Sequence, residues 1–157
     1  MTSLRIRAAT TADADDIALV VNDAFRSERF FTDYDRTNPE NVRELLQKGK
    51  FLLLYDASEL VACVYIEHCG DRGYFGMLAV EPKHQKSGLG ARLIAAAEQD
   101  CRDSGCRFMD LTLVNLRTEL PAYYERFGYV ENGTLPFPSD QNQPKMPAHL
   151  IRMSKAL

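Results

Sequence analysis

Hydrophobic and polar positions alternate or recur with a helical period along most of the chain. Residues 4–8 alternate apolar with polar side chains, which predicts a first strand. Apolar positions then recur with a helical period from Ile17 to Phe25, which predicts a helix. Its first turn is rich in aspartate, and Thr11 can cap it. A second helix is predicted from the cap residue Asn38, with proline at its first position, to a stop at Gly49.

Three strand-like runs follow, separated by gaps of hairpin length. They lie at residues 50–55, 60–68 and 74–80, and the short gaps predict an antiparallel meander. A helix over residues 88–103 has one apolar face and a glycine stop at Gly105.

The rest of the chain is predicted as a strand, a short helix, a strand, a long proline-rich loop and a last strand. These elements lie at residues 107–114, at 119–126, from 129 onward, at 135–147 and at 149–153. Because no repeat, linker or low-complexity tract interrupts them, we expect one α+β domain over residues 1–157. Its predicted order is β-α-α-β-β-β-α-β-α-β-β.

The composition of the 157 residues is that of an ordinary globular domain, with 45% hydrophobic and 26% charged residues. No apolar run approaches the ~20 residues that a membrane helix needs, and the first residues lack the apolar run of a secretory signal. With 19 basic against 22 acidic residues, the chain shows no basic face for a nucleic acid. We therefore expect a cytoplasmic protein without a membrane or nucleic-acid partner.

The four cysteines follow no metal-binding or disulfide pattern. Cys63, Cys69, Cys101 and Cys106 form no C-x-x-C pair, and His68 beside Cys69 is the nearest approach to a metal pair. We expect no metal and interpret the thiols as small buried hydrophobes in a reducing compartment.

The most informative segment is a strand that runs through a polar, glycine-containing loop directly into a helix, over residues 77–93. This arrangement directs free backbone N–H groups and the positive end of a helix dipole at one point, where a phosphate can bind. Gly88 and Gly90 let the backbone approach an anion closely. Positive charge is added by Lys83, Lys86 and Arg92.

Two common phosphate motifs are excluded here. The Gly-Lys-Ser/Thr of a P-loop is absent, and the third glycine of the dinucleotide fingerprint would fall on Leu93. A plain connection between strand and helix remains the alternative.

Two motifs together resemble the GNAT N-acetyltransferase superfamily. Gln85-x-x-Gly88-x-Gly90 after a strand and Pro82 resembles its acyl-coenzyme A motif. Asn115 after a strand, followed by the helical phrase at residues 120–129, resembles its second signature. The resemblance implies a mixed, mostly antiparallel central sheet flanked by helices. It also implies transfer of an acetyl group from acetyl-coenzyme A to an amine, with no metal.

The resemblance also assigns residues to the cofactor. Backbone N–H groups of the loop would hold the pyrophosphate, and these residues are Gln85, Lys86, Ser87, Gly88, Leu89, Gly90 and Ala91. Pantetheine would lie in a notch beside the strand Leu78-Ala79-Val80, pairing with the backbone of Leu78 and Val80, and Asn115 would hydrogen-bond its arm. A backbone N–H near Val80 would polarise the thioester carbonyl.

The resemblance assigns Tyr124 as the general acid that protonates the departing thiolate. Tyr124 directly precedes an acidic residue, as the family's tyrosine does. Tyr123 is the alternative. The position of the family's usual base, a glutamate, is Gly76. The sequence does not show which group replaces this glutamate as the general base. One of four side chains could act, directly or through a chain of water molecules. The four are Glu28, Glu67, His68 and His149.

We expect the acceptor to be a small-molecule amine that binds between residues 27–37 and 135–147. A protein or peptide amine is the alternative acceptor. Because Gly76 stands where the family has a glutamate, a non-catalytic module that binds acyl-coenzyme A is a further alternative. The resemblance leaves a homodimer through the last strands open as well.

Overall fold

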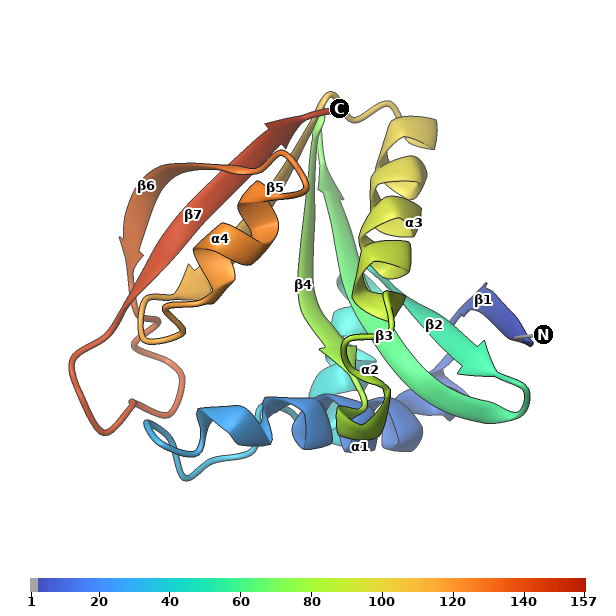
Figure 1. Cartoon of the computed structure of the whole chain (residues 1–157), viewed down its shortest axis with the longest axis horizontal. Helices are drawn as coiled ribbons and strands as arrows, with labels where there is room; N and C mark the ends of the chain where they lie inside the picture. The colour runs from blue at the N-terminus through green and yellow to red at the C-terminus, as the bar shows by residue number, and fades with distance from the viewer. Residues whose placement is uncertain (1–2) are drawn as a thin grey trace.

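The computed structural model describes residues 3–157 as a seven-stranded sheet with helices on both faces (Figure 1). The strands are β1 (Leu4–Ala8), β2 (Lys50–Asp56), β3 (Glu59–Cys69), β4 (Arg72–Val80), β5 (Phe108–Val114), β6 (Val130–Pro136) and β7 (His149–Ala156). The helices are α1 (Ala14–Ala24), α2 (Pro39–Lys48), α3 (Leu89–Asp103) and α4 (Leu120–Glu125), with short 3-10 turns η1 (Thr11–Asp13), η2 (Phe25–Glu28) and η3 (Pro82–His84). The predicted α+β class and element order are confirmed.

The sheet has the order β1-β2-β3-β4-β5-β7-β6, and its centre is the parallel pair β4 and β5. The other neighbouring strands pair antiparallel. Pairing of β4 with β5 is confined to Arg72–Tyr74 against Phe108–Asp110, after which the two strands separate. The sheet therefore opens like a V, closed near the C-terminus (Figure 1).

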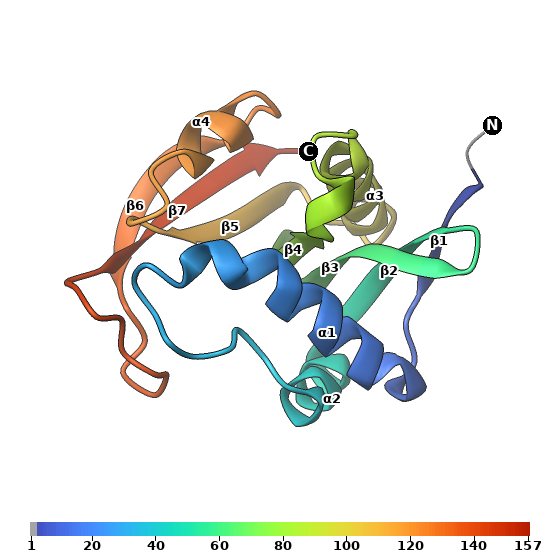
Figure 2. The same ribbon diagram turned by 60° about the horizontal axis from the view of Figure 1, so that its bottom comes forward.

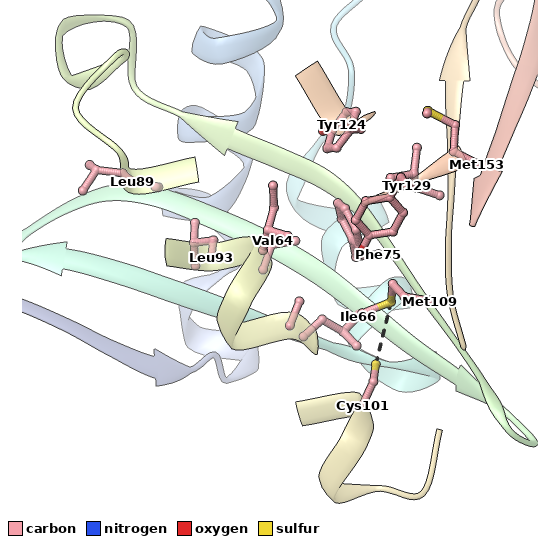
Figure 3. Packing of buried hydrophobic residues seen from close by; sticks show 14 of the residues in the cluster. Val64, Ile66, Phe75, Leu89, Leu93, Cys101, Met109, Tyr124, Tyr129 and Met153 are labelled. Atoms are coloured by element: carbon pink, nitrogen blue, oxygen red, sulfur yellow. Dashed lines mark hydrogen bonds between the residues drawn. The ribbon is translucent and has the colours of Figure 1, made fainter. Parts of the chain in front are cut away.

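Two hydrophobic clusters cover the two faces of the sheet. One packs α3 and α4 against the central strands, and the other packs α1 and α2 against β2, β3 and β4 (Figure 2). In the first cluster the ring of Phe75 on β4 lies 5.9 Å from Tyr124 and 5.8 Å from Tyr129 (Figure 3). Aromatic contacts thus join the two arms of the V.

A buried carboxylate also joins the arms. Glu98 on α3 accepts hydrogen bonds from the Tyr129 hydroxyl at 2.8 Å and from the Lys155 ammonium at 3.0 Å. Because an unpaired buried charge is costly, these partners fix α3 to β7.

The first helix differs from the prediction at its start. Thr10, not Thr11, is the cap residue, and the first turn is the 3-10 turn η1. The Asp13 carboxylate accepts from the Arg7 guanidinium at 2.8 Å and 2.9 Å and from the Thr10 N–H at 2.8 Å. The Arg7 side chain remains 36% exposed in this ion pair, and Ile6 is 39% exposed on β1, an edge strand.

Two smaller predictions were also tested. Gly49 ends α2 with an extended backbone rather than a left-handed one, and a Cβ there would collide with the Ile66 carbonyl. Three of the four cysteines are buried, as expected, but Cys69 is exposed near the end of β3. Within residues 3–157 no helix has both the length and the apolar character to span a membrane.

Candidate active site

A cavity of about 790 Å³ lies in the opening between β4 and β5. Gly76, Leu78 and Val80 line it from β4, and residues 111–114 line it from β5. The start of α3 and the helix α4 complete its wall. A cavity is therefore present where the resemblance would place pantetheine, and its occupant stays a prediction.

A β-bulge bends β4 where it leaves β5. The register passes from Tyr65↔Gly76 to Cys63↔Ala79, so Met77 and Leu78 together face one residue of β3. Met77 has a left-handed backbone, with φ of 48°. A bulge kinks its strand and redirects side chains, and here it accompanies the departure of β4 from its neighbour.

The loop before α3 is held against the end of β4. The Gln85 side chain donates to the Val80 carbonyl at 3.0 Å, and the Ser87 hydroxyl donates to the His84 carbonyl. Lys86 and Gly88 have left-handed backbones, with φ of 68° and 83°. Such conformations are costly in a non-glycine residue and tend to persist at binding sites, so the loop has the character of a preformed ligand cradle.

The N-terminus of α3 opens onto this cavity. The Arg92 N–H bonds to the Gly88 carbonyl at 3.2 Å, so the N–H groups of the three residues between them have no partner within the helix. These residues, Leu89 to Ala91, line the cavity. Partly positive N–H groups facing a hollow are suited to a phosphate.

The two glycines serve different purposes. Gly88 has open space around it and is required for its left-handed backbone. A Cβ on Gly90 would lie 2.7 Å from the Tyr123 hydroxyl, so Gly90 permits the close approach of α4 to α3.

Tyr124 lies in the cavity wall with 7% of its surface exposed. Its ring contacts that of Phe75 (Figure 3). It also meets the ring of Tyr123 edge to face, with 5.0 Å between the ring centroids. Burial raises the pKa of Tyr124 well above its usual value of 10. The phenol therefore stays protonated at neutral pH.

A second cavity, of about 930 Å³, lies between the two segments that the sequence selects for the acceptor. Its lining includes residues 31–32 and 34–37 on one side and residues 137–138, 140–142 and 144 on the other. Lys145 joins these segments, because its N–H donates to the Phe31 carbonyl at 2.7 Å and its ammonium lies 2.8 Å from Asp33. The two segments thus line one cavity, and its role as the acceptor site stays a prediction.

Glu28 and Tyr74 line both cavities and so lie at their junction. The Glu28 carboxylate accepts from the Arg117 guanidinium at 3.0 Å and is 9% exposed. Burial raises the pKa of Glu28 above its usual range, and Arg117 offsets part of that effect. Among the described residues that line the cavities, Glu67, His68 and His149 do not occur, so geometry selects Glu28 from the four candidate bases.

Most predicted site residues meet at the first cavity. Its lining includes Leu78, Val80, Gln85, Lys86, Gly88, Leu89, Gly90, Ala91 and Tyr124. Ala79 is instead buried against the α1 face, because neighbouring residues of a strand face opposite sides. Ser87 is outside the lining, and so is Asn115, whose side chain accepts from the His149 N–H at 2.8 Å. The roles of all these residues stay predictions.

Several solved structures that share this fold are N-acetyltransferases by name. Ribosomal-protein-S18-alanine N-acetyltransferase from Escherichia coli matches 98% of this chain and 93% of its own, with 16% identity and a TM-score of 0.76. PaiA N-acetyltransferase from Thermoplasma acidophilum, in complex with coenzyme A, matches 99% of both chains with 13% identity and a TM-score of 0.78. Ard1 from Thermoplasma volcanium matches 99% of this chain and 98% of its own, with 18% identity and a TM-score of 0.79.

Residues 16–129 match the acetyltransferase (GNAT) family. The match covers most of the 157 residues, so the chain belongs to this family. Its members use acetyl-coenzyme A as acyl donor and act on amines, in some cases those of proteins.

Proposed function

We propose that the protein transfers the acetyl group of acetyl-coenzyme A to a primary amine of a small cationic molecule, by direct attack in a ternary complex. The observation that carries this proposal is the meeting of two cavities at Glu28 and Tyr74. One cavity has the features of an acyl-coenzyme A site, and the other opens to a separate acidic surface. A donor and an acceptor can therefore occupy adjoining spaces.

The donor is assigned to the cavity between β4 and β5. The N-terminus of α3 and the loop residues 85–91 are suited to hold its pyrophosphate, with Lys86 adding positive charge. The β4 backbone beside Leu78 and Val80 is free of β5 and can pair with an extended amide-containing arm. The assignment of acetyl-coenzyme A to this cavity is thus supported by the unpaired edge of β4 and by the N-terminus of α3, whose N–H groups face the cavity.

Glu28 is proposed as the group that takes the proton from the acceptor. An alkylammonium has a pKa of about 10 and cannot attack a thioester until it loses a proton. A carboxylate whose pKa is raised by burial is a better base than an ordinary one, and Glu28 lies where the acceptor would meet the donor. Arg117 positions it.

Tyr124 is proposed to donate its proton to the sulfur as the carbon–sulfur bond breaks. The amine nitrogen forms the new bond to the acetyl carbon, Glu28 receives the amine proton, and the thiolate receives the Tyr124 proton. The phenolate then regains a proton from solvent. Burial of Tyr124 keeps it protonated until that step.

The acceptor cavity favours a cation. Its lining includes one guanidinium, Arg36, and five carboxylates: Glu28, Asp35, Glu40, Glu44 and Asp140. Asp35 is paired with Arg29, at 2.7 Å, and Glu28 with Arg117. The other three carboxylates have no ion-pair partner among the described residues, and they would favour a second ammonium on the acceptor.

The test measures thiol release from acetyl-coenzyme A across a panel of amines. Aliphatic diamines and polyamines should be acetylated with a lower KM than monoamines of the same length, and amino acids should react poorly. Turnover with N-terminal peptides alone would support the protein-acceptor alternative. Binding of acetyl-coenzyme A without turnover on any amine would support the binding module. We expect the protein to act in the cytoplasm, without a membrane or nucleic-acid partner.

A further inference from the structure

Three side chains with metal-binding atoms meet far from the two cavities. They are His68, Cys101 and Cys106, and their ligand atoms all lie within 4.8 Å of one another. They come from β3, from the last turn of α3 and from the segment that follows it. The cluster lies near the paired end of β4 and β5, whereas both cavities lie where these strands have separated.

The end of α3 brings the two thiols together. The Cys106 N–H bonds to the Cys101 carbonyl at 2.9 Å, and the Gly105 N–H bonds to the Arg102 carbonyl at 3.0 Å. Gly105 has the left-handed backbone, with φ of 88°, that such a helix end requires. Helix ends of this type commonly bring these two positions into apolar contact, so the pair alone is not a site.

The third side chain makes the cluster more than a helix end. His68 reaches the thiols from β3, and its Nε2 lies 3.1 Å from the Asp100 carboxylate. Asp100 is in turn held by the Lys50 ammonium at 2.8 Å. Histidines that bind metals almost always have a carboxylate or carbonyl on the ring to fix its orientation.

We propose that Cys101, Cys106 and His68 bind a zinc ion. Two thiolates and one imidazole form a ligand set that zinc prefers, and their charges neutralise the ion when both thiols release their protons to solvent. Asp100 acts as a positioning residue for His68.

The surroundings suit a soft metal. Cys101 is fully buried, and its sulfur lies 3.9 Å from the sulfur of Met109, a further soft atom, on the interior side (Figure 3). The His68 side chain is 31% exposed and provides the access route from solvent. A solvent molecule would take the fourth tetrahedral position, on the exposed side of His68. Because the ion would join β3 to the end of α3, we assign it a stabilising role rather than one in acetyl transfer.

The test titrates the reduced full-length protein, free of coenzyme A, with Cd²⁺ and follows the ultraviolet absorbance of cadmium–thiolate bonds. We expect saturation at one ion per chain, loss of the signal in Cys101→Ser and Cys106→Ser, and displacement of Cd²⁺ by Zn²⁺. His68→Gln should weaken binding at least tenfold, and Asp100→Asn should weaken it by about tenfold. Zn²⁺ should raise the Tm of the wild type more than that of His68→Gln.

Cys69→Ser is the matched control, because Cys69 is exposed, adjoins His68 in sequence and lies outside the cluster. It should bind Cd²⁺ like the wild type. Loss of the signal in Cys69→Ser, or its absence in the wild type, would overturn the proposal. Since His68 and Cys69 lie at the surface, this pair of variants decides the question even if a buried cysteine variant does not fold.

Discussion

The hydroxyl of Tyr74 lies over Gly76, 2.7 Å from the point where a Cβ of residue 76 would stand. Position 76 is where the family resemblance places a glutamate, so the phenol of Tyr74 fills the space into which that side chain would extend. The glycine at position 76 and the ring position of Tyr74 therefore depend on each other. Tyr74 lies at the junction of the two cavities.

This relationship predicts an energetic coupling between the two positions. Gly76→Ala should destabilise the wild type by about 1–3 kcal/mol, because the added methyl group displaces the Tyr74 ring. The cost should fall in a Tyr74→Phe background, where the closest atom is gone. Urea unfolding of the four proteins in a double-mutant cycle measures the coupling. Equal costs in both backgrounds would show that the ring moves freely.

Gly88→Ala should weaken binding of acetyl-coenzyme A by about tenfold, because a Cβ disfavours the left-handed backbone that shapes the phosphate loop. Titration calorimetry measures the affinity. Gly105→Ala is the control, since Gly105 also has a left-handed backbone and open space around it. Each change should cost about 1–2 kcal/mol of stability. Equal affinities in the two variants would contradict the cofactor assignment.

Tyr124→Phe should lower kcat by about 10²-fold and leave the affinity for acetyl-coenzyme A near that of the wild type. The change removes the proton donor and keeps the ring that packs on Phe75. Tyr123→Phe makes the same change at the neighbouring residue, whose hydroxyl lies against Gly90. It should retain kcat. The reverse result would move the acid to Tyr123, and full kcat in both would remove tyrosine from the proton transfer.

Glu28→Gln should lower kcat/KM by about 10²-fold at neutral pH. Burial raises the pKa of Glu28, so the wild-type rate should fall on acidification at a pH above the usual carboxyl range, as the base becomes protonated. The deficit of Glu28→Gln should shrink as the pH approaches about 10, where the amine is already neutral.

The control for Glu28 is Glu119→Gln. Glu119 contacts the same guanidinium, with 3.3 Å between Arg117 Nε and its carboxylate, but it is 64% exposed. This variant should keep the rate at neutral pH, and its pH profile should shift only slightly to lower pH, because Glu119 is a minor cause of the raised pKa of Glu28. A constant deficit of Glu28→Gln at every pH would indicate that Glu28 only positions Arg117 or the acceptor.

The sequence predicted the order of elements because each carries a local signal. Hydrophobic periodicity located α3, and the glycines at positions 88 and 105 marked its two ends. The exposure of Ile6 could not be predicted, because the same alternation describes a strand whose inner face is covered and one at the edge of a sheet.

Contacts between distant segments carried no such signal. Arg117 meets Glu28 across 89 positions, and neither residue belongs to a recognisable motif. The position of Tyr74 over Gly76 depends on the ring orientation, which the spacing of two residues does not determine. The His68 cluster was missed because its ligands come from separate elements, while the sequence drew attention to the neighbouring Cys69.

The separation of β4 from β5 leaves two unpaired strand edges facing each other inside one sheet. Exposed edges ordinarily invite pairing with another protein chain and hence aggregation. Here α3 and α4 stand at the rim of the gap, and the three paired positions at its closed end hold the edges in place. A slender ligand can reach these backbone groups, but a strand that carries its own sheet cannot. The helices at the rim thus hinder a strand of another chain from pairing with these two edges.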